Sequence, residues 1–182
     1  CFNNHKKGDF LPYVYKSMDK GRTWTSITAN LPTRGSTSAI AQDHIDPNLL
    51  FVGTEFGLFV SNNGGVSWIQ MKSGLPTIAV RDIAIQKREN DLVLGTFGRG
   101  FYVLDDYSAL RNSNEETLSA PGVLFSVRDP LLYEPSYPMG LPGQSFQGDS
   151  YYRGENLPSV AMFTYYLKDE IQSIQEQRRE RE

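Results

Sequence analysis

Cysteine and histidine are scarce in this sequence, and long apolar runs are missing. It contains one cysteine, Cys1, and two histidines, His5 and His44. A single cysteine permits no internal disulfide, and two histidines in different segments lack the spacing of a metal site. No apolar run approaches the roughly 18 residues that a membrane-spanning helix requires. We therefore expect no disulfide scaffold, no bound metal and no membrane span.

The sequence also lacks common signatures of cofactor binding and of a nucleophilic serine. Gly95, Gly98 and Gly100 do not form G-x-G-x-x-G, and they lie between expected strands instead of opening a helix. The segment 143–148 is one residue too long for a G-x-S-x-G turn, and no strand precedes it. We expect no cofactor.

Positive charge is in slight deficit. Lys and Arg together number 18 and Asp and Glu number 21, so the net charge is −3 and the isoelectric point is about 5.5. Such a chain has no basic field to hold a polyanion. Nucleic acid and an anionic membrane surface are therefore not expected partners.

What the sequence does contain is an internal repeat. Residues 17–24 are S-M-D-K-G-R-T-W and residues 61–68 are S-N-N-G-G-V-S-W, so both follow the pattern S-x-(D/N)-x-G-x-(S/T)-W. The two copies are 44 positions apart, and F-V-G-T at 51–54 recurs as V-L-G-T at 93–96. A repeat of roughly 40 to 45 residues filled with short strands is typical of β-propeller blades.

Each octapeptide joins two short apolar runs, which predicts the turn of a β-hairpin. The glycine supplies positive φ, the Asp or Asn folds back onto turn N–H groups, and the hydroxyl residues add local hydrogen bonds. The tryptophan opens the outgoing strand and is expected to pack between neighbouring sheets. The predicted structural residues are Ser17, Asp19, Gly21, Thr23 and Trp24 in the first copy, and Ser61, Asn63, Gly65, Ser67 and Trp68 in the second.

The apolar runs around the octapeptides predict three successive groups of strands. The first group is truncated and follows a loop at 1–12, the second has four strands, and the third has three. The third lacks an octapeptide, and residues 106–111 predict an N-capped helical turn in its place. The predicted strands are 13–17 and 24–28; 38–44, 49–54, 57–60 and 68–71; 80–86, 92–96 and 100–104.

This pattern predicts an all-β chain with three segments. Residues 1–111 form about two to three four-stranded blades of a partial β-propeller. Residues 112–158 are rich in Pro and Gly and form an extended linker, and residues 159–182 form a strand at 160–167 followed by a polar helical tail. The apolar residues expected to hold the linker are Phe125, Leu131, Leu132 and Tyr133. Because so few blades cannot close a ring, we expect a fragment of a longer protein or one piece of a split protein.

The octapeptides resemble the Asp-box (BNR) repeat of sialidase-like, sortilin/VPS10-like and photosystem-assembly-factor-like β-propellers. The first copy matches fully, and the second has Asn63 for Asp and Ser67 for Thr. Residues 50–57 and 96–101 also resemble the end of the propeller in large exported bacterial proteins labelled glycosyl hydrolase repeat proteins. The resemblance implies an extracytoplasmic location, a ring completed by further blades, and a following β-sandwich. Residues 17–24 and 61–68 are called the first and second Asp box below.

Propellers generally bind ligands on the rim opposite their Asp boxes, where loops link the second to the third strand or cross between blades. In this chain those loops hold two candidate catalytic acids, Glu55 and Asp82. They also hold candidate ligand-binding residues, namely Arg34, Phe56, Arg81, Phe97 and Arg99. A glycosidase needs two carboxylates at a defined separation, Arg can bind a carboxylate bidentately, and Phe can stack on a sugar.

Each of these residues also has a structural interpretation. Arg81 and Asp82 can form an ion pair with each other, Glu55 can cap a turn, and the Phe rings can pack between blades. The structural interpretation is the commoner one for such residues. The sequence therefore names candidate residues at the rim but does not determine which reaction or ligand they serve.

Structural residues are abundant in this sequence, and no complete catalytic set is present. The arginine triad and Tyr/Glu pair of a sialidase cannot be assembled from it. We therefore expect a non-catalytic binding or scaffolding module of an exported bacterial protein, recognising a protein, a peptide or a glycan. The alternative is a sialidase-like or xyloglucanase-like glycoside hydrolase whose remaining catalytic residues lie elsewhere. A third possibility is that another polypeptide completes the ring.

Overall fold

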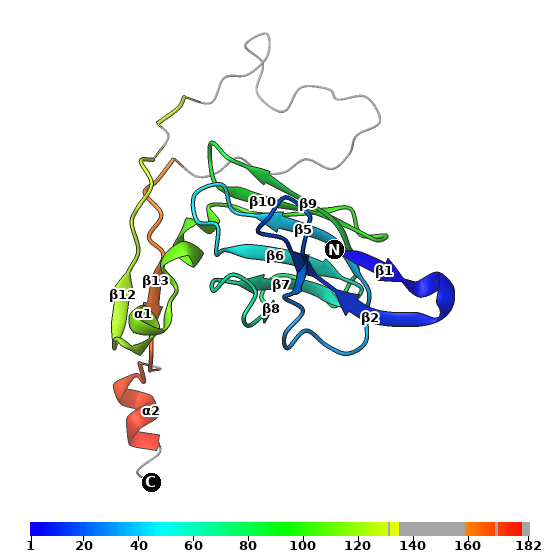
Figure 1. Ribbon diagram of the computed structural model, residues 1–182. Coiled ribbons are helices and arrows are strands. Elements are labelled where there is room, and N and C mark those ends of the chain that lie inside the picture. Colours follow the sequence, from blue (N-terminus) through cyan, green and yellow to red (C-terminus); the bar gives the residue numbers. More distant parts are fainter. Residues whose placement is uncertain (131, 135–158, 170, 180–182) are drawn as a thin grey trace. The chain divides into compact units, whose positions relative to one another are not determined.

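The computed structural model describes residues 1–130, 132–134, 159–169 and 171–179 (Figure 1). The chain divides into two compact units, Cys1–Ser119 and Ala120–Glu182, which are described separately. Both contain small antiparallel sheets, and the helices are short. The expectation of an all-β chain is therefore confirmed.

A four-stranded antiparallel sheet lies at the centre of the first unit (Figure 1). Its strands follow one another in sequence and in space, so the sheet is a simple meander. They are β5 (Thr37–Gln42), β6 (Leu50–Thr54), β7 (Gly57–Ser61) and β8 (Ile69–Met71). All four coincide with strands predicted from the repeat. The β6–β7 register pairs Val52 with Phe59 and Thr54 with Gly57, which leaves a two-residue turn.

Two further sheets flank the central one. The first is the hairpin of β3 (Tyr15–Lys16) and β4 (Thr25–Ser26), joined by the first Asp box. The second contains β9 (Val80–Gln86), β10 (Asp91–Thr96) and β11 (Phe101–Leu104), in the order β11-β10-β9. A 3-10 helix, η2 (Tyr107–Asn112), follows where a third Asp box would fall, and Asp106 caps it by accepting a hydrogen bond from the Ser108 amide. The predicted capped turn is confirmed.

The central sheet is covered on both faces. Every residue of β6 and β7 is buried. One core joins the central sheet to the β9–β11 sheet and consists of Leu49, Phe51, Leu58, Val60, Val80, Leu92, Leu94 and Tyr107. The other joins it to the β3–β4 hairpin and consists of Val14, Leu31, Leu50, Val52, Phe59 and Trp68. Each fully buried aliphatic or aromatic side chain contributes about 1.5–3 kcal/mol, so the stacking of sheets dominates the stability of this unit.

Residues 1–12 are not the loop that the sequence suggested. They contain β1 (Phe2–Asn4), the 3-10 turn η1 (His5–Lys7) and most of β2 (Asp9–Tyr13). The aromatic ring of Phe2 stacks on that of Tyr13 at 4.8 Å between centroids, and the Phe2 carbonyl accepts a hydrogen bond from Thr37 Oγ1. These contacts order a segment whose polar residues and proline predict a loop.

The stretch around residue 115 also departs from expectation. The helix α1 (Glu115–Ser119) and the strand β12 (Gly122–Leu124) lie within the predicted linker. In the second unit β12 pairs with β13 (Tyr165–Leu167), which is shorter than the predicted strand, and α2 (Ile174–Arg179) follows. Amid the prolines and glycines of residues 112–158, the three residues of β12 are too few to show a strand period. Leu131 and residues 135–158, including segment 143–148 and most of the predicted linker, lie outside the described residues.

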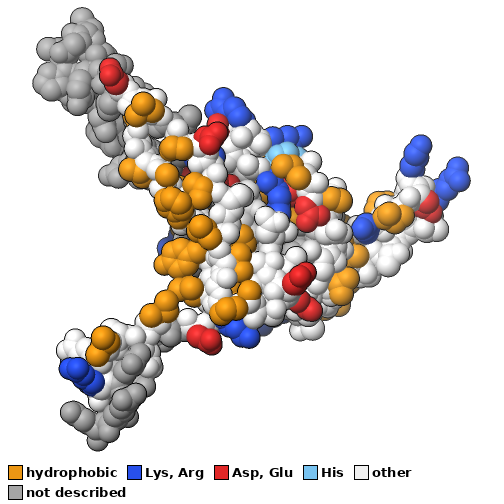
Figure 2. All heavy atoms as spheres, turned by 90° about the vertical axis from the view of Figure 1, so that its left-hand side faces the viewer, with side chains coloured by type: hydrophobic (Ala, Val, Ile, Leu, Met, Phe, Trp, Pro, Cys, Tyr) orange, Lys and Arg blue, Asp and Glu red, His pale blue; other side chains and the backbone are white. Residues whose placement is uncertain are grey.

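Charged side chains of both signs are interspersed on the face shown in Figure 2. This distribution agrees with the small net charge of −3. Within the described part of the chain, no helix is both long enough and apolar enough to cross a membrane.

The contact between stacked sheets can be tested at two equivalent glycines. A Cβ at Gly53 would lie 2.7 Å from the Val80 carbonyl oxygen, whereas a Cβ at Gly95, one repeat later, would lie 3.4 Å from the Asp82 Cβ. We expect Gly53→Ala to lower the free energy of unfolding by about 1–3 kcal/mol because it forces the sheets apart. Gly95→Ala is the matched control and should change it by less than about 1 kcal/mol. Urea unfolding of both variants checks this, and equal losses would contradict it.

Candidate functional site

The two Asp boxes close on nearly the same hydrogen bonds. In the first, Asp19 Oδ1 accepts from the Thr23 amide at 2.8 Å, and Ser17 Oγ accepts from the Gly21 amide at 2.7 Å. In the second, Asn63 Oδ1 accepts from the Ser67 amide at 3.0 Å, and Ser61 Oγ accepts from the Gly65 amide at 2.9 Å. Their polar side chains are therefore occupied within their own turns, as a structural role requires.

The carboxylate of the first box and the amide of the second have equivalent partners but differ in charge. Asp19 Oδ2 accepts from Thr23 Oγ1 at 2.7 Å, whereas Asn63 Nδ2 donates to Ser67 Oγ at 2.8 Å. Hydrogen bonds from the Thr23 amide and then the Thr23 hydroxyl lower the pKa of Asp19 to about 2. The first box thus prefers an ionised carboxylate, and the second is neutral.

The tryptophans of the two boxes differ in their surroundings. Trp68 is 3% exposed, its Nε1 donates to the Ile27 carbonyl at 2.8 Å, and Asn30 binds both its amide and its carbonyl. Trp24 is 62% exposed, and its Nε1 donates to Gly21 within its own turn. The expected packing between neighbouring sheets holds for Trp68 and is wrong for Trp24. The sheet that precedes the β3–β4 hairpin, β1 with β2, leaves that indole exposed.

Two of the predicted rim residues, Arg81 and Phe97, lie side by side. Phe97 follows β10 and its amide donates to the Ala79 carbonyl at 2.9 Å, which places it beside the start of β9. The guanidinium carbon of Arg81 lies 5.5 Å from the centre of the Phe97 ring, and Arg81 Nη1 donates to Ser38 Oγ at 3.4 Å. The Phe97 ring is nonetheless 70% exposed. Arg81 and Phe97 therefore form an open cation–aromatic pair on one edge of the stacked sheets, called the rim pair below.

Phe56 lies at the β6–β7 turn, and its ring fills the space that a Cβ at Gly35 would take. The ring is 40% exposed, so this contact covers only part of it. The Glu55 amide donates to the Ser36 carbonyl at 3.3 Å, so this turn approaches the start of β5. Phe56 is thus fixed against the backbone and still open to solvent.

The remaining rim candidates are not drawn together. Asp82 Oδ1 accepts a hydrogen bond from the Ile83 amide at 2.9 Å, so the suggested ion pair between Arg81 and Asp82 is not formed. Arg34 and Arg99 are exposed, and neither side chain makes a hydrogen bond or an ion pair with the described residues. No described contact links Glu55 to Asp82.

A set of polar residues in the first unit, joined by hydrogen bonds, was missed by the sequence analysis. Asp43 is 5% exposed and accepts two hydrogen bonds from Arg111, both at 2.8 Å, and one from the Tyr107 hydroxyl at 2.6 Å. Arg111 also donates to Asn90 Oδ1 at 2.7 Å, and His44 Nδ1 lies 3.4 Å from Asp43 Oδ1. These five residues are called the buried polar cluster. Because 68 positions separate Asp43 from Arg111, no local pattern pointed to it.

The acid of the buried polar cluster is held by neighbouring hydrogen-bond donors. Burial favours the neutral form of Asp43, but hydrogen bonds from Arg111, the Asp46 amide and Tyr107 outweigh it and hold the pKa of this carboxyl well below its usual range. Burial, and then the hydrogen bond to Asp43, raises the pKa of Tyr107 well above its usual value. An ionised acid and a neutral phenol are thereby fixed at neutral pH. The cluster joins η2 to the β5–β6 connection, and Arg111 and Tyr107 occupy both oxygens of its Asp43 carboxylate.

The free energy of unfolding should depend on pH through the Asp19 carboxylate. Because its pKa is lowered to about 2 in the folded state, its contribution is present above the unfolded pKa of about 4 and is lost as pH falls through about 2. We expect Asp19→Asn to lower the melting temperature at pH 6, with a gap to wild type that narrows between pH 4 and pH 2. The reciprocal variant Asn63→Asp should acquire this acid sensitivity. A gap that stays constant over the pH range would show that Asp19 does not act through its charge.

Removing Arg111 should leave the Asp43 carboxylate buried without its cation. We expect Arg111→Met to lower the free energy of unfolding by about 3–5 kcal/mol. Arg88→Met is the matched control, because the Arg88 side chain is 83% exposed in its ion pair with Glu89. Exposed pairs of this kind contribute about 0–1 kcal/mol. Chemical denaturation at pH 7 compares the two, and similar losses would refute the importance of the buried polar cluster.

The described part of the chain contains no set of side chains suited to bind a metal ion. There, no group of three or more His, Cys, Asp or Glu side chains lies together in a way that could hold a metal ion. Comparison with known proteins adds no assignment. No protein-family model matches the chain, and no curated protein sequence matches it either.

Proposed function

We propose that the stacked sheets of the first unit are blades of an Asp-box β-propeller. The support comes from comparing equivalent positions in successive sheets. Trp68 is covered by the preceding hairpin, whereas Trp24 is exposed. The strand β7 is buried throughout, whereas Phe101 and Val103 of β11 are 79% and 55% exposed. Both outer sheets therefore carry apolar surfaces whose counterparts in the central sheet are covered, and further blades of the same or another polypeptide are the proposed cover.

We propose that this module binds ligands at its rim and does not catalyse a reaction. The observation that carries the proposal is the rim pair, in which Arg81 is held by Phe97 and Ser38 while the Phe97 ring stays 70% exposed. A guanidinium binds carboxylates through parallel hydrogen bonds, and an exposed ring stacks on a sugar face or an apolar side chain. The proposed ligand is a protein, peptide or glycan with a carboxylate beside an apolar or sugar face.

A non-catalytic role agrees with how the acids are used. Asp82 accepts a backbone hydrogen bond from Ile83, and Asp43 and Asp19 are held by neighbouring donors. Hydrolysis of a glycosidic bond would require two carboxylates facing each other across the substrate. The proposed setting is that of an exported bacterial protein, as the Asp-box resemblance implies.

Binding can be tested on an array of uronic-acid-containing and sialylated glycans together with peptides that end in a free carboxylate. We expect binding that weakens roughly tenfold or more in Arg81→Ala and in Phe97→Ala, because each change removes one of the two recognising groups. Arg88→Ala is the control, since it removes an exposed arginine elsewhere, and it should bind as wild type does.

The same ligands should be incubated with the protein and examined for cleavage. Binding without turnover supports the proposal. Turnover that disappears in Glu55→Gln or Asp82→Asn would replace it with the glycoside hydrolase alternative. Binding that is unchanged in both rim variants would move the site away from Arg81 and Phe97.

A further inference from the structure

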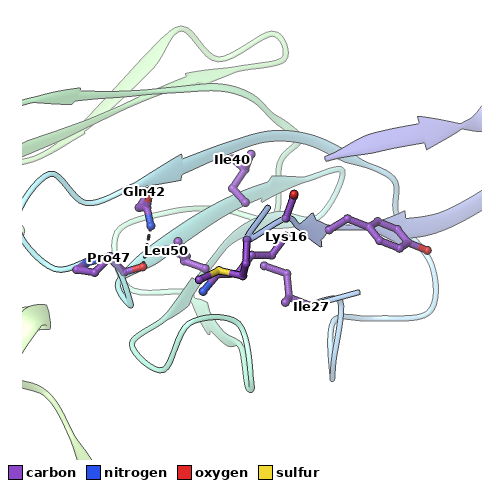
Figure 3. Close-up of a pocket in the computed structure, with 9 residues that line it drawn as sticks. Lys16, Ile27, Ile40, Gln42, Pro47 and Leu50 are labelled. Carbon is purple, nitrogen blue, oxygen red and sulfur yellow. Dashed lines mark hydrogen bonds between the residues drawn. The ribbon is translucent and has the colours of Figure 1, made fainter. Parts of the chain in front are cut away.

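A groove of about 480 Å³ opens between the β3–β4 hairpin and the central sheet (Figure 3). Its walls are mainly apolar, with Ile27 on the hairpin side and Ile40 and Leu50 on the central sheet. At one end Gln42 Nε2 donates to the Pro47 carbonyl at 2.9 Å. Lys16 is the one charged residue among the nine that line the groove, all of which are described. The groove therefore offers apolar walls beside a single cation.

One side of the groove is a strand edge. β3 pairs with β4, and the Ile27 amide donates to the Val14 carbonyl at 2.9 Å. In an antiparallel pair, successive residues direct their N–H and C=O groups to opposite edges. The N–H and C=O of Tyr15 therefore point away from β4, toward an edge with which no described strand is paired at Tyr15 or Lys16. Backbone groups on such an edge are ready to pair with another strand.

The internal repeat shows which strand occupies the equivalent edge 44 residues later in the chain. Ser17 and Ser61 begin the two Asp boxes, so Lys16 corresponds to Val60, and Tyr15 to Phe59. In the central sheet β6 lies along that edge, with Phe51 opposite Val60 and Val52 opposite Phe59.

The hairpin at 1–13 occupies only the end of the equivalent edge. Tyr13 corresponds to Gly57, whose partner is Thr54, and Tyr13 is paired with Phe2 of β1. The positions equivalent to Phe51 and Val52 lie opposite Lys16 and Tyr15, which line the groove. β1 therefore lies at one end of the position that corresponds to β6 in the central sheet.

We propose that this groove binds an extended, apolar peptide strand, which adds to the free edge of β3 as β6 adds to β7. The strand lies antiparallel to β3, and Tyr15 supplies the paired amide and carbonyl. Alternate side chains of the strand enter between Ile27, Ile40 and Leu50. This is strand addition, in which backbone hydrogen bonds give affinity and the pockets for alternate side chains give selectivity. The inference rests on the internal repeat and is independent of the rim ligand.

The probe is a C-terminally amidated peptide that copies residues 46–52, in which Leu49 and Phe51 are the side chains that pack toward the following sheet in the first unit. We expect saturable binding to the full chain by calorimetry, and slower hydrogen exchange at the Tyr15 amide in the complex. The same peptide with Val52→Pro is the control, because it lacks the N–H that would donate to the Tyr15 carbonyl. It should bind at least tenfold more weakly.

A pair of protein variants locates the site. Ile40→Lys places a charge on the groove wall at a residue that is already 38% exposed, and it should weaken peptide binding at least tenfold. Ile69→Lys makes the same change on β8, outside the groove, at a residue that is 63% exposed, and it should leave binding unchanged. Absence of saturable binding to wild type, equal binding of the proline peptide, or an unprotected Tyr15 amide would each overturn the proposal.

Discussion

Leu50, Phe51 and Val52 point alternately to the two faces of the central sheet, and each face must be covered because all three residues are apolar. This double burial is the constraint on which the first unit depends. A strand that is apolar at every position cannot lie at the surface of a molecule, so it requires a sheet on either side. The hairpin of β3 and β4 supplies one cover, and β9 and β10 supply the other. The outer sheets have the same requirement, yet Trp24 and Phe101 are exposed where their counterparts in the central sheet are buried.

Polar groups in this unit are used to fix turns and connections. In each Asp box, the polar side chains form hydrogen bonds within the same eight residues. In the buried polar cluster, Asp43, Tyr107 and Arg111 are hydrogen-bonded to one another. At the rim, Arg81 and Phe97 form an exposed pair, and Phe56, Arg34 and Arg99 are also open to solvent. The distinction between satisfied and open groups therefore separates the structural residues from the binding candidates more clearly than residue type does.

Much of the strand arrangement could be predicted, because it depends on local patterns. The meander β5 to β8 and the strands β9 to β11 follow from short apolar runs separated by glycine-containing turns, and the repeat confirms the register of one against the other. Exposure could not be predicted in the same way. Trp24 and Trp68 occupy identical motif positions, yet only Trp68 is covered by the hairpin that precedes it. The pairing of Asp43 with Arg111 and of β12 with β13 was also missed, since each joins residues more than 40 positions apart.

The sequence separation of these contacts also bears on the order in which the unit assembles. An Asp box closes over four residues, whereas the Asp43–Arg111 pair closes over 68. The entropy lost on closing a chain segment rises with its length, so the hairpin turns can form before the sheets have met. The ion pair can close only after the central sheet and the β9–β11 sheet have stacked. It is therefore a late contact, one that prolongs the lifetime of the folded unit without hastening its formation.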